Sequence, residues 1–502
     1  MCIHDQPFCF ARESGFTSAQ GNYFFLQAVL QIMNYRPAVM KFGGTSLEDA
    51  AAFERVALIV HAQRASHPII VVSAMSRVTD ALIESVRRAS DGNDVAALTV
   101  LEEHFARHIH VAEQLLPAEQ TRRTISEAIE RARLELTDLL RNIAAQLMPL
   151  PFLQDVIVSY GERLSATLLA EVLRERELPA RYVDARRCIV TDNAHTRATP
   201  LTNETNRQTR KELSPLIETA HIPVLGGFIA ASKDGSTTTL GRGGSDYTAA
   251  LVGAAMNARE IQIWTDVAGI LTADPRVVSN ARTVHRMSYR EAAELAYFGA
   301  KVLHPKTIQP AVDTSIPVRI CNSHAPEETG TIVCAEAEAS PRTVKAIAHK
   351  TGITLVQITS ARMLGAYGFL YSLFEIFNRH KLVVDVVTTS EVSVSLSVEN
   401  GQTLSSALKD LEELGTIEIE SKHAVVCVVG EGLRTTPGIA ARVFSAVGDI
   451  NIALISQGAS SINLTFVVDE AHAREAVRRL HEALFEREAE EVKENGVQAA
   501  HS

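Results

Sequence analysis

"VMKFGGTSLED", residues 39–49, places a lysine and two glycines directly after an apolar pair. The stretch is not a P-loop, because the lysine of a P-loop follows the glycines, whereas Lys41 precedes Gly43 and Gly44. With Lys41 at the end of a strand, the glycines could bring backbone N–H groups to a phosphate while the ammonium adds a compact charge. The same residues could form a plain strand-to-helix turn with a Thr-Ser N-cap. Alone, the stretch leaves both interpretations open.

The composition predicts a large multidomain protein without a membrane span. A chain of 502 residues exceeds what one hydrophobic core organises, so we expect two to four domains. No run approaches the roughly 20 apolar residues of a membrane helix. The formal net charge of −10 opposes nucleic acid binding. Six cysteines without a C-x-x-C pair favour free thiols in a reducing cytosol, so we expect a cytoplasmic protein without disulfides or zinc sites.

Strand-like runs alternate with helical stretches through the first two thirds of the chain, among them "AVMKF", "PIIVVSA", "IPVLGGFIA" and "EIQIWTDV". This alternation predicts an α/β fold with a mostly parallel sheet sandwiched by helices. Residues 91–147 are almost free of glycine and proline and carry apolar residues at helical spacing. They predict a helical insertion, whose simplest role is scaffolding.

The last third contains an internal repeat. The segment that begins at Gly368 matches the segment that begins at Gly438, 70 residues later, without a gap. Each copy predicts a turn, a helix, a strand, a turn and a strand, and one such unit buries only one sheet face. Chance similarity is the alternative, but we expect the two copies to pack on one another.

A second glycine loop, "TTTLGRGGSDYTAAL" at residues 237–251, surrounds Arg242 with glycines and then opens a helix with Ser245 and Asp246. The guanidinium offers a planar fork for a carboxylate, and Asp246 could hold an ammonium. An amino acid needs both contacts. Asp246 could instead be a simple N-cap, although that would not explain an arginine confined between glycines.

Four further motifs have plain structural alternatives. "SAMSRVTDALI" and "IVSYGERLSATLLA" place Thr79 and Glu162 at strand-to-helix junctions, where either could bind a ligand or cap a helix. "IWTDVAGILTADPR" ends a strand in a loop, and such loops bind ligands in open α/β sheets, but a Thr-Asp pair alone would be an ordinary turn. In "YFGAKVLHPKT", Lys301 could be a solvated surface charge.

Taken together and in this order, these six motifs closely resemble the aspartate kinases of the amino acid kinase family. "VVDVVTTSEVSVSLSV" is similar to their regulatory ACT portion, and the resemblance runs from residue 39 to about residue 485. It implies an amino acid kinase fold followed by two βαββ ACT-type domains. The expected division is a leader at 1–36, a catalytic domain at 37–337, ACT-like domains at 338–415 and 416–490, and a tail at 491–502. Whether the ACT-like units are consecutive or interleaved stays open.

The resemblance implies transfer of the ATP γ-phosphoryl group to the side-chain carboxylate of L-aspartate, giving 4-phospho-L-aspartate, the first step toward lysine, threonine and methionine. Mg²⁺ would accompany the nucleotide, and no separate protein metal site is expected. A carboxylate is already nucleophilic at neutral pH, so this reaction needs positioning and charge neutralisation more than a strong base.

By the same resemblance, the catalytic residues would be Lys41, Arg242 and Asp246. The amino acid would be bound by Thr79, Glu162, Arg242, Gly243, Gly244 and Ser245. The nucleotide would be bound by Lys41, Phe42, Gly43, Gly44, Thr265, Asp266, Leu271, Asp274, Arg276 and Lys301. Related enzymes often carry a tyrosine at the position of Leu271, so packing against the adenine would differ.

A feedback amino acid is expected to bind the ACT-like region through Met363, Phe369, Val384, Asp385, Ser390 and Glu391. Gly365, Ala366 and Val383 stand where the lysine-sensitive relatives tend to carry polar side chains. Lysine is favoured as the effector and threonine is the alternative. The resemblance also implies a homodimer or a dimer of dimers through the ACT-like domains, of the monofunctional type without a fused homoserine dehydrogenase.

Two other functions compete. Another amino acid kinase, acting on glutamate or acetylglutamate, could share the fold, but the helical insertion, "GRGGSDYTAAL" and the tandem repeat argue against it. A catalytically silent amino acid sensor could use the repeat alone. The joint presence of Lys41, Glu162, Arg242 and Asp246 makes that reading the weaker one.

Overall fold

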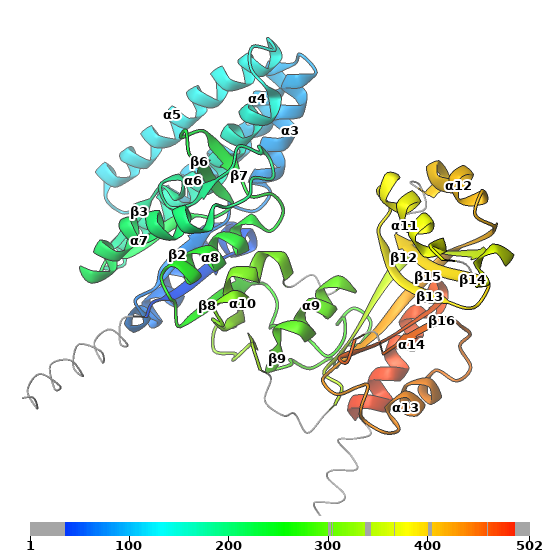
Figure 1. Ribbon diagram of the computed structural model, residues 1–502. Helices are drawn as coiled ribbons and strands as arrows, with labels where there is room; N and C mark the ends of the chain where they lie inside the picture. Colours follow the sequence, from blue (N-terminus) through cyan, green and yellow to red (C-terminus); the bar gives the residue numbers. More distant parts are fainter. Residues whose placement is uncertain are drawn as a thin grey trace, which may run out of the picture.

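The computed structural model describes residues 36–299, 303, 305–336, 343–365, 367–399, 404–458 and 460–486 (Figure 1). The expected leader up to residue 35 and the tail from residue 491 lie outside these residues, as do Lys301, Ala366 and the expected boundary near residue 338. Within the described ranges, no helix is long and apolar enough to cross a lipid bilayer.

An eight-stranded sheet forms the centre of the N-terminal part, in the order β3-β5-β2-β1-β8-β10-β11-β9. Its strands pair in parallel except β10 with β11, which confirms the expected mostly parallel sheet. Strand β2 is a continuous apolar run, and the neighbouring β1 is mostly apolar, as burial on both faces requires. The strands are β1 (Ala38–Phe42), β2 (Ile69–Val72), β3 (Ala180–Val183), β5 (Ile222–Gly226), β8 (Glu260–Thr265), β9 (Arg286–Ser288), β10 (Val318–Asn322) and β11 (Thr331–Cys334).

Helices cover both faces of this sheet. Successive side chains of a strand point to opposite sides, so both faces carry apolar side chains that must be buried. Met40 and Phe42 of β1 pack with α2 and the long helices, whereas Val39 packs on the side of α7, α8, α9 and α10. Lys41 therefore shares the face that meets α8. The bounds are α2 (Ala50–Ala62), α7 (Thr202–Glu218), α8 (Gly244–Ala255), α9 (Tyr289–Tyr297) and α10 (Gln309–Asp313).

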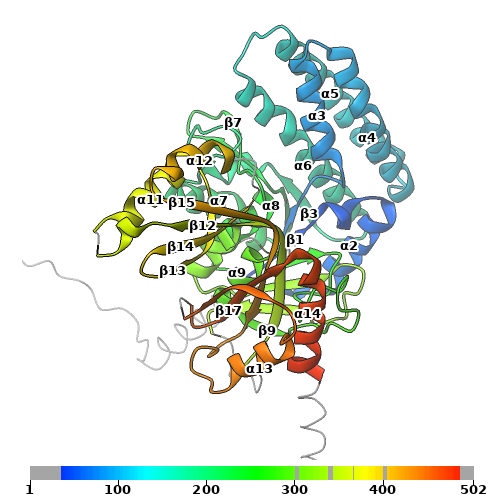
Figure 2. The same cartoon turned by 90° about the vertical axis from the view of Figure 1, so that its right-hand side faces the viewer.

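The helical insertion forms two antiparallel helices that extend away from the sheet, as Figures 1 and 2 show from two sides. These are α4 (Asp94–Leu115) and α5 (Glu119–Ala144), and they pack on α3 (Val78–Ser90) and α6 (Leu150–Glu175). Beside them lies a small sheet of β4 (Val190–Thr191), β6 (Ile229–Ser232) and β7 (Thr237–Thr239). Short helical turns are η1 (Gly44–Leu47), η2 (Arg64–Ser66), η3 (Ala185–Arg187), η4 (Pro305–Ile308), η5 (Ala361–Met363), η6 (Glu470–His472) and η7 (Glu482–Glu486).

The C-terminal part is one six-stranded antiparallel sheet in the order β13-β14-β12-β15-β17-β16. Figures 1 and 2 show α11 and α12 at one end of it and α13 and α14 at the other. The elements are β12 (Ala346–Thr359), α11 (Phe369–Arg379), β13 (Val384–Thr389), β14 (Ser393–Glu399), α12 (Leu404–Glu412), β15 (Thr416–Val429), α13 (Ile439–Ala446), β16 (Ile452–Gln457), β17 (Asn463–Asp469) and α14 (Ala473–His481).

The sequence repeat is visible in this sheet. Gly368 and Gly438 are the N-caps of α11 and α13, and both adopt the left-handed conformation, with φ of 83° and 80°. Each helix is followed by a hairpin, β13–β14 in one copy and β16–β17 in the other. The expected order of turn, helix and two strands is therefore present in both copies.

Strand pairing shows that the two units are interleaved. Residues 353–359 of β12 pair with β14 and with the first part of β15, whereas residues 346–350 pair with residues 425–429 of β15. That second part of β15 also pairs with β17. Both long strands thus serve both units. The expected division between residues 415 and 416 needs correction, because it separates β15 from the unit that its first half completes.

Candidate active site

The structure brings the predicted catalytic and amino-acid-binding residues into one cleft with a volume of about 480 Å³. The cleft lies above the carboxyl end of β1, between α3, α6 and the start of α8. Its predicted lining residues are Lys41, Thr79, Glu162, Arg242, Gly243, Gly244, Ser245 and Asp246. Residues distant in the sequence therefore meet as expected for ligand binding at this edge of an α/β sheet.

Lys41 and Asp246 form an ion pair, with Nζ 2.7 Å from Oδ1. Asp246 lies in the first turn of α8, where a negative charge also complements the helix dipole. The N-cap of this helix is Gly243, and no side chain caps it. The N-cap alternative for Asp246 is therefore wrong, and its carboxylate orients the Lys41 ammonium instead.

Glu162 is buried in the cleft floor, with 3% of its surface exposed, and its Oε2 has no hydrogen-bond partner among the described residues. It lies in the middle of α6, so its expected place at a strand-to-helix junction is wrong. Burial raises the pKa of Glu162 to about 8. An incoming cation would relieve the cost of ionising this carboxylate, so the residue suits an ammonium ligand.

Arg242 is exposed at the rim of the cleft and makes no ion pair with any described residue. The glycines on either side, Gly241 and Gly243, have φ of 73° and 74°, a region that L side chains rarely adopt. A Cβ on Gly243 would also lie 2.8 Å from Cγ2 of Thr307. The loop thus needs glycines, and it leaves the guanidinium free to bind an anion.

A second cleft of about 430 Å³ opens next to the first and shares Ser73 and Thr79 with it. Gly43, Gly44, Thr265 and Asp266 line it at the carboxyl ends of β1 and β8. Its position suits the phosphates of a nucleotide that reacts with a ligand in the first cleft.

Two expected nucleotide contacts need correction. The N–H of Gly43 donates to the Trp264 carbonyl at 3.1 Å, so it is not available to a phosphate. The Phe42 side chain is fully buried and stacks on the Trp264 ring, with centroids 5.9 Å apart. Phe42 can therefore contact a ligand only through its backbone, and the N–H groups that remain candidates for a phosphate start at Gly44.

Three further nucleotide candidates line a separate, largely apolar pocket of about 360 Å³ between the loop after β8 and β12. Leu271, Asp274 and Arg276 lie there, and Arg276 is paired with Asp274 at 2.7 Å. The Arg276 guanidinium lowers the pKa of that carboxyl. The C-terminal sheet holds this loop, since the N–H of Ile347 donates to the Thr272 carbonyl at 2.8 Å.

The expected effector residues lie at one end of the C-terminal sheet, in η5, α11, β13 and the β13–β14 turn. Asp385 already has two partners: Lys350 Nζ lies 3.3 Å away, and the Tyr297 hydroxyl of α9 donates to it. Lys350 also pairs with Glu399. Asp385 therefore connects the predicted effector region to the N-terminal part of the chain.

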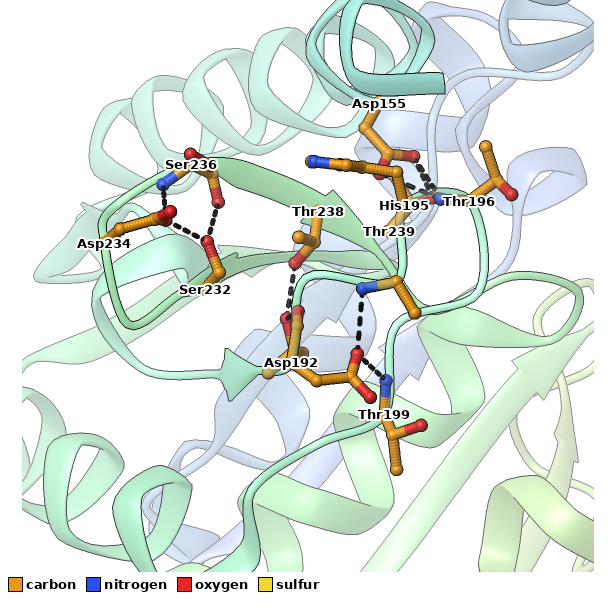
Figure 3. A network of polar contacts seen from close by, with 12 residues as sticks. Asp155, Asp192, His195, Thr196, Thr199, Ser232, Asp234, Ser236, Thr238 and Thr239 are labelled. Atoms are coloured by element: carbon orange, nitrogen blue, oxygen red, sulfur yellow. Dashed lines mark hydrogen bonds and ion pairs between the residues drawn. The ribbon is translucent and has the colours of Figure 1, made fainter. Parts of the chain in front are cut away.

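Sequence reasoning missed Asp155, a completely buried carboxylate of α6 that organises one wall of the cleft (Figure 3). The available signal was a lone aspartate inside the apolar run "LPFLQDVIV". Across the described part of the chain, no group of three or more His, Cys, Asp and Glu side chains is arranged to hold a metal ion.

Comparison with protein families gives two matches. The amino acid kinase family matches residues 36–322, and an ACT domain matches residues 426–484. Among curated proteins, lysine-sensitive aspartokinase 3 of Escherichia coli is 40% identical over 456 residues, which cover 89% of this chain and 99% of that protein. Chloroplastic aspartokinase 1 of Arabidopsis thaliana is 34% identical, covering 89% of this chain and 80% of that protein.

Solved structures agree in fold. Aspartokinase III of Escherichia coli, in complex with lysine and aspartate in the T-state, superposes with a TM-score of 0.76 at 38% identity, covering 90% of this chain and 100% of that one. Its R-state complex with aspartate and ADP gives the same values. The aspartate kinase of Clostridium acetobutylicum has a TM-score of 0.73 at 27% identity and covers 89% of this chain and 100% of that one.

Proposed function

The chain belongs to the aspartokinases of the amino acid kinase family, and we propose that it phosphorylates the side-chain carboxylate of L-aspartate with ATP in the cleft between β1, α6 and α8. The observation that carries this proposal is the meeting of three groups in one cleft: a guanidinium and a buried carboxylate oxygen that have no partner among the described residues, and an oriented ammonium. An amino acid with a second carboxylate needs these three groups.

Arg242 binds the α-carboxylate of aspartate, and Glu162 receives the α-ammonium. Thr79 and Ser245 complete the pocket from the starts of α3 and α8. Because Glu162 is largely protonated at neutral pH before aspartate arrives, ammonium binding discharges its proton to solvent. With both α-substituents held, the side-chain carboxylate of the substrate is free to face Lys41.

A carboxylate oxygen of the substrate attacks the γ-phosphorus, and the bond from that phosphorus to the bridging oxygen of ADP breaks. No proton needs to move. Lys41, held by Asp246, neutralises the charge on the transferring group, which supplies the electrostatic stabilisation that phosphoryl transfer requires. Asp246 is thus a positioning residue, and replacing it would misplace the lysine.

The nucleotide phosphates occupy the second cleft, at Gly44, Thr265 and Asp266. Leu271, Asp274 and Arg276 bind the remainder of the nucleotide in the outer loop, together with Lys301, which lies outside the described residues. Mg²⁺ bound with the nucleotide would neutralise part of the charge on its phosphates. The Asp266 carboxylate, which lines the second cleft, would be the protein group suited to hold it, because Asp246 is paired with Lys41.

Regulation is proposed through the C-terminal units, with lysine as the effector and threonine as the second candidate. The lysine complex of the Escherichia coli enzyme supports this choice. Binding would use Met363, Phe369, Val384, Asp385, Ser390 and Glu391. The catalytic domain is proposed to span residues 37–337, and the amino acid kinase match over 36–322 supports that extent.

A homodimer through the C-terminal units is proposed from the apolar side chains that α11 and its flanks expose. Tyr367 and Tyr371 are 104% and 72% exposed, and Leu364, Phe374 and Val383 are exposed near them. Large apolar patches of this kind are typical of interfaces. The free, buried thiols of Cys188, Cys321 and Cys427 support the cytoplasmic location that we propose.

The experiment is ATP-dependent acyl phosphate formation, trapped with hydroxylamine, with L-aspartate and L-glutamate compared. Product from aspartate alone supports the proposal, and product from glutamate alone would favour another amino acid kinase. No product in a folded chain that binds amino acids would favour the silent sensor. Repeating the aspartate assay with lysine and with threonine identifies the effector.

A further inference from the structure

Asp155 connects three separate segments beside the cleft, as Figure 3 shows. Its oxygens accept the backbone N–H of Thr196 at 2.9 and 3.1 Å and the Thr239 hydroxyl at 2.5 Å. His195 Nδ1 donates to Oδ2 at 2.9 Å. The carboxylate is completely buried, so it is satisfied by these contacts and not by bulk water.

Two of the groups that Asp155 holds are themselves walls of the cleft, because Thr196 and Thr239 both line it. Thr196 has φ of 70°, a left-handed conformation that is unfavourable for a β-branched residue. The bond that its N–H donates to Asp155 stabilises this conformation. The loop at residues 192–199 is therefore held in a shape that its sequence alone would not choose.

The same loop supports the arginine-bearing turn. The N–H of Ala198 donates to the Thr239 carbonyl at 2.9 Å, and a Cβ built on Gly241 would lie 3.4 Å from the Thr196 carbonyl oxygen. Gly241 directly precedes Arg242. The contacts of Asp155 thus lead within a few residues to the guanidinium that we assign to the substrate carboxylate.

Asp155 also lies on the helix that carries the ammonium-binding carboxylate. Asp155 and Glu162 are seven residues apart in α6, and this spacing of about two helical turns puts them on the same face. One rigid helix therefore fixes Glu162 directly and the opposite, arginine-bearing wall through Asp155.

We propose that Asp155 is a positioning residue for L-aspartate, which sets the separation of Arg242 and Glu162 by fixing residues 192–199 and the end of β7. This inference rests on the proposed function. It concerns the amino acid subsite only, since none of the groups that bind Asp155 lines the cleft assigned to the nucleotide phosphates.

A matched control is present in the same small sheet. At the β6–β7 turn, Asp234 accepts the N–H of Ser236 at 3.0 Å, the hydroxyl of Ser232 and, at 3.5 Å, the side-chain amide of Asn193, but none of these partners lines the cleft (Figure 3). Asp234→Asn perturbs a comparable polar turn at the far end of β7. It should leave both KM values unchanged.

The test compares Asp155→Asn, Thr239→Val and Asp234→Asn with the unaltered chain, measuring kcat, the KM values for aspartate and ATP, and Tm. We expect the KM for aspartate to rise about tenfold in Asp155→Asn and about threefold in Thr239→Val, because each loses hydrogen bonds at a fixed loop. The KM for ATP should stay within about twofold of the original value in both variants, which is less than the change expected from the loss of one hydrogen bond.

A purely structural role would lower Tm and the active fraction while leaving the KM for aspartate unchanged, and that result would overturn the inference. Equal rises in both KM values would also overturn it. If Asp155→Asn does not fold, Thr239→Val decides by the same criteria. If the unaltered chain forms no acyl phosphate from aspartate, the proposed function fails and this inference fails with it.

Discussion

Lys41 at the end of β1 and Asp246 in the first turn of α8 are joined by an ion pair of 2.7 Å. The two residues come from different glycine motifs, and their side chains are only 12% and 18% exposed. In such a setting an ammonium is held by one carboxylate, and it presents its remaining N–H groups to the cleft. This relationship links the glycine motif after β1 to the glycine motif that we propose binds the amino acid.

Lys41→Met should reduce acyl phosphate formation by at least about a thousandfold, because the transferring phosphoryl group loses its neutralising charge. The fold should persist with a loss of up to about 3 kcal/mol, since Asp246 becomes an unpaired and mostly buried carboxylate. The hydroxamate assay and urea unfolding measure the two effects. The double variant Lys41→Met/Asp246→Asn should regain stability but not activity. Turnover near the original rate in Lys41→Met would refute the catalytic role.

Glu162 gives a pH-dependent prediction. Its pKa is about 8 in the folded chain against 4.5 ordinarily, so the folded state binds more protons between these values. Its contribution to stability is therefore complete below about pH 4.5 and is lost as pH rises through 8. Glu162→Gln should remove this pH-dependent part of the free energy of unfolding. Chemical unfolding of both chains at pH 6 and pH 8.5 measures the difference.

The same carboxyl predicts proton release on substrate binding. Near pH 7, aspartate should displace up to about one proton, because its ammonium favours the ionised form of Glu162. Calorimetric titration in two buffers of different ionisation enthalpy measures the number. Glu162→Gln should bind aspartate more weakly and release none from this position. Equal proton release by both chains would exclude Glu162 as the source.

His108 gives a prediction of opposite sign in the helical insertion. It is buried, its Nδ1 lies 2.7 Å from the His104 carbonyl, and its Nε2 has no partner among the described residues. Burial lowers the pKa of His108 to about 4, so the unfolded state binds more protons below the ordinary value of 6.5. Stability should fall as pH drops from 6.5 toward 4. In His108→Phe, the free energy of unfolding measured with urea should fall less between pH 6.5 and pH 4. An unchanged pH dependence would show that His108 is not its cause.

The sequence motifs predicted most of the cleft because strand ends meet at one edge of a parallel sheet. Burial of the Phe42 side chain was predictable, since alternation along β1 places it on the opposite face from Lys41. The position of Glu162 inside α6 was not predictable, because a glycine such as Gly161 usually indicates the end of a helix. A Cβ on Gly161 would lie 2.8 Å from the Ala74 Cβ, so this glycine permits close packing inside a helix.

The interleaving of the two ACT-like units could not be predicted from the sequence, for a different reason. The repeat predicted each helix and hairpin, but β12 and β15 each span two units, and which half pairs with which partner depends on long-range register. Local pattern carries no information on that choice. Asp155 was likewise hidden, since its partners at Thr196 and Thr239 are about 40 and 80 residues away in the chain.

The final prediction concerns communication between the two parts of the chain. The Tyr297 hydroxyl, in the helix just before the segment with Lys301, donates to Asp385 in the proposed effector region. Burial and the neighbouring Asp385 carboxylate raise the pKa of Tyr297, so it remains a donor at all working pH values. An effector ammonium that binds Asp385 must compete with this hydroxyl and with Lys350. Tyr297→Phe should therefore change the inhibitory concentration of lysine by about fivefold or more, as expected for coupling of about 1 kcal/mol. In the absence of effector, Tyr297→Phe should leave kcat and the KM values for aspartate and ATP unchanged, because Tyr297 lines neither cleft. Unchanged inhibition in Tyr297→Phe, with lysine still inhibiting, would show that this contact does not carry the signal.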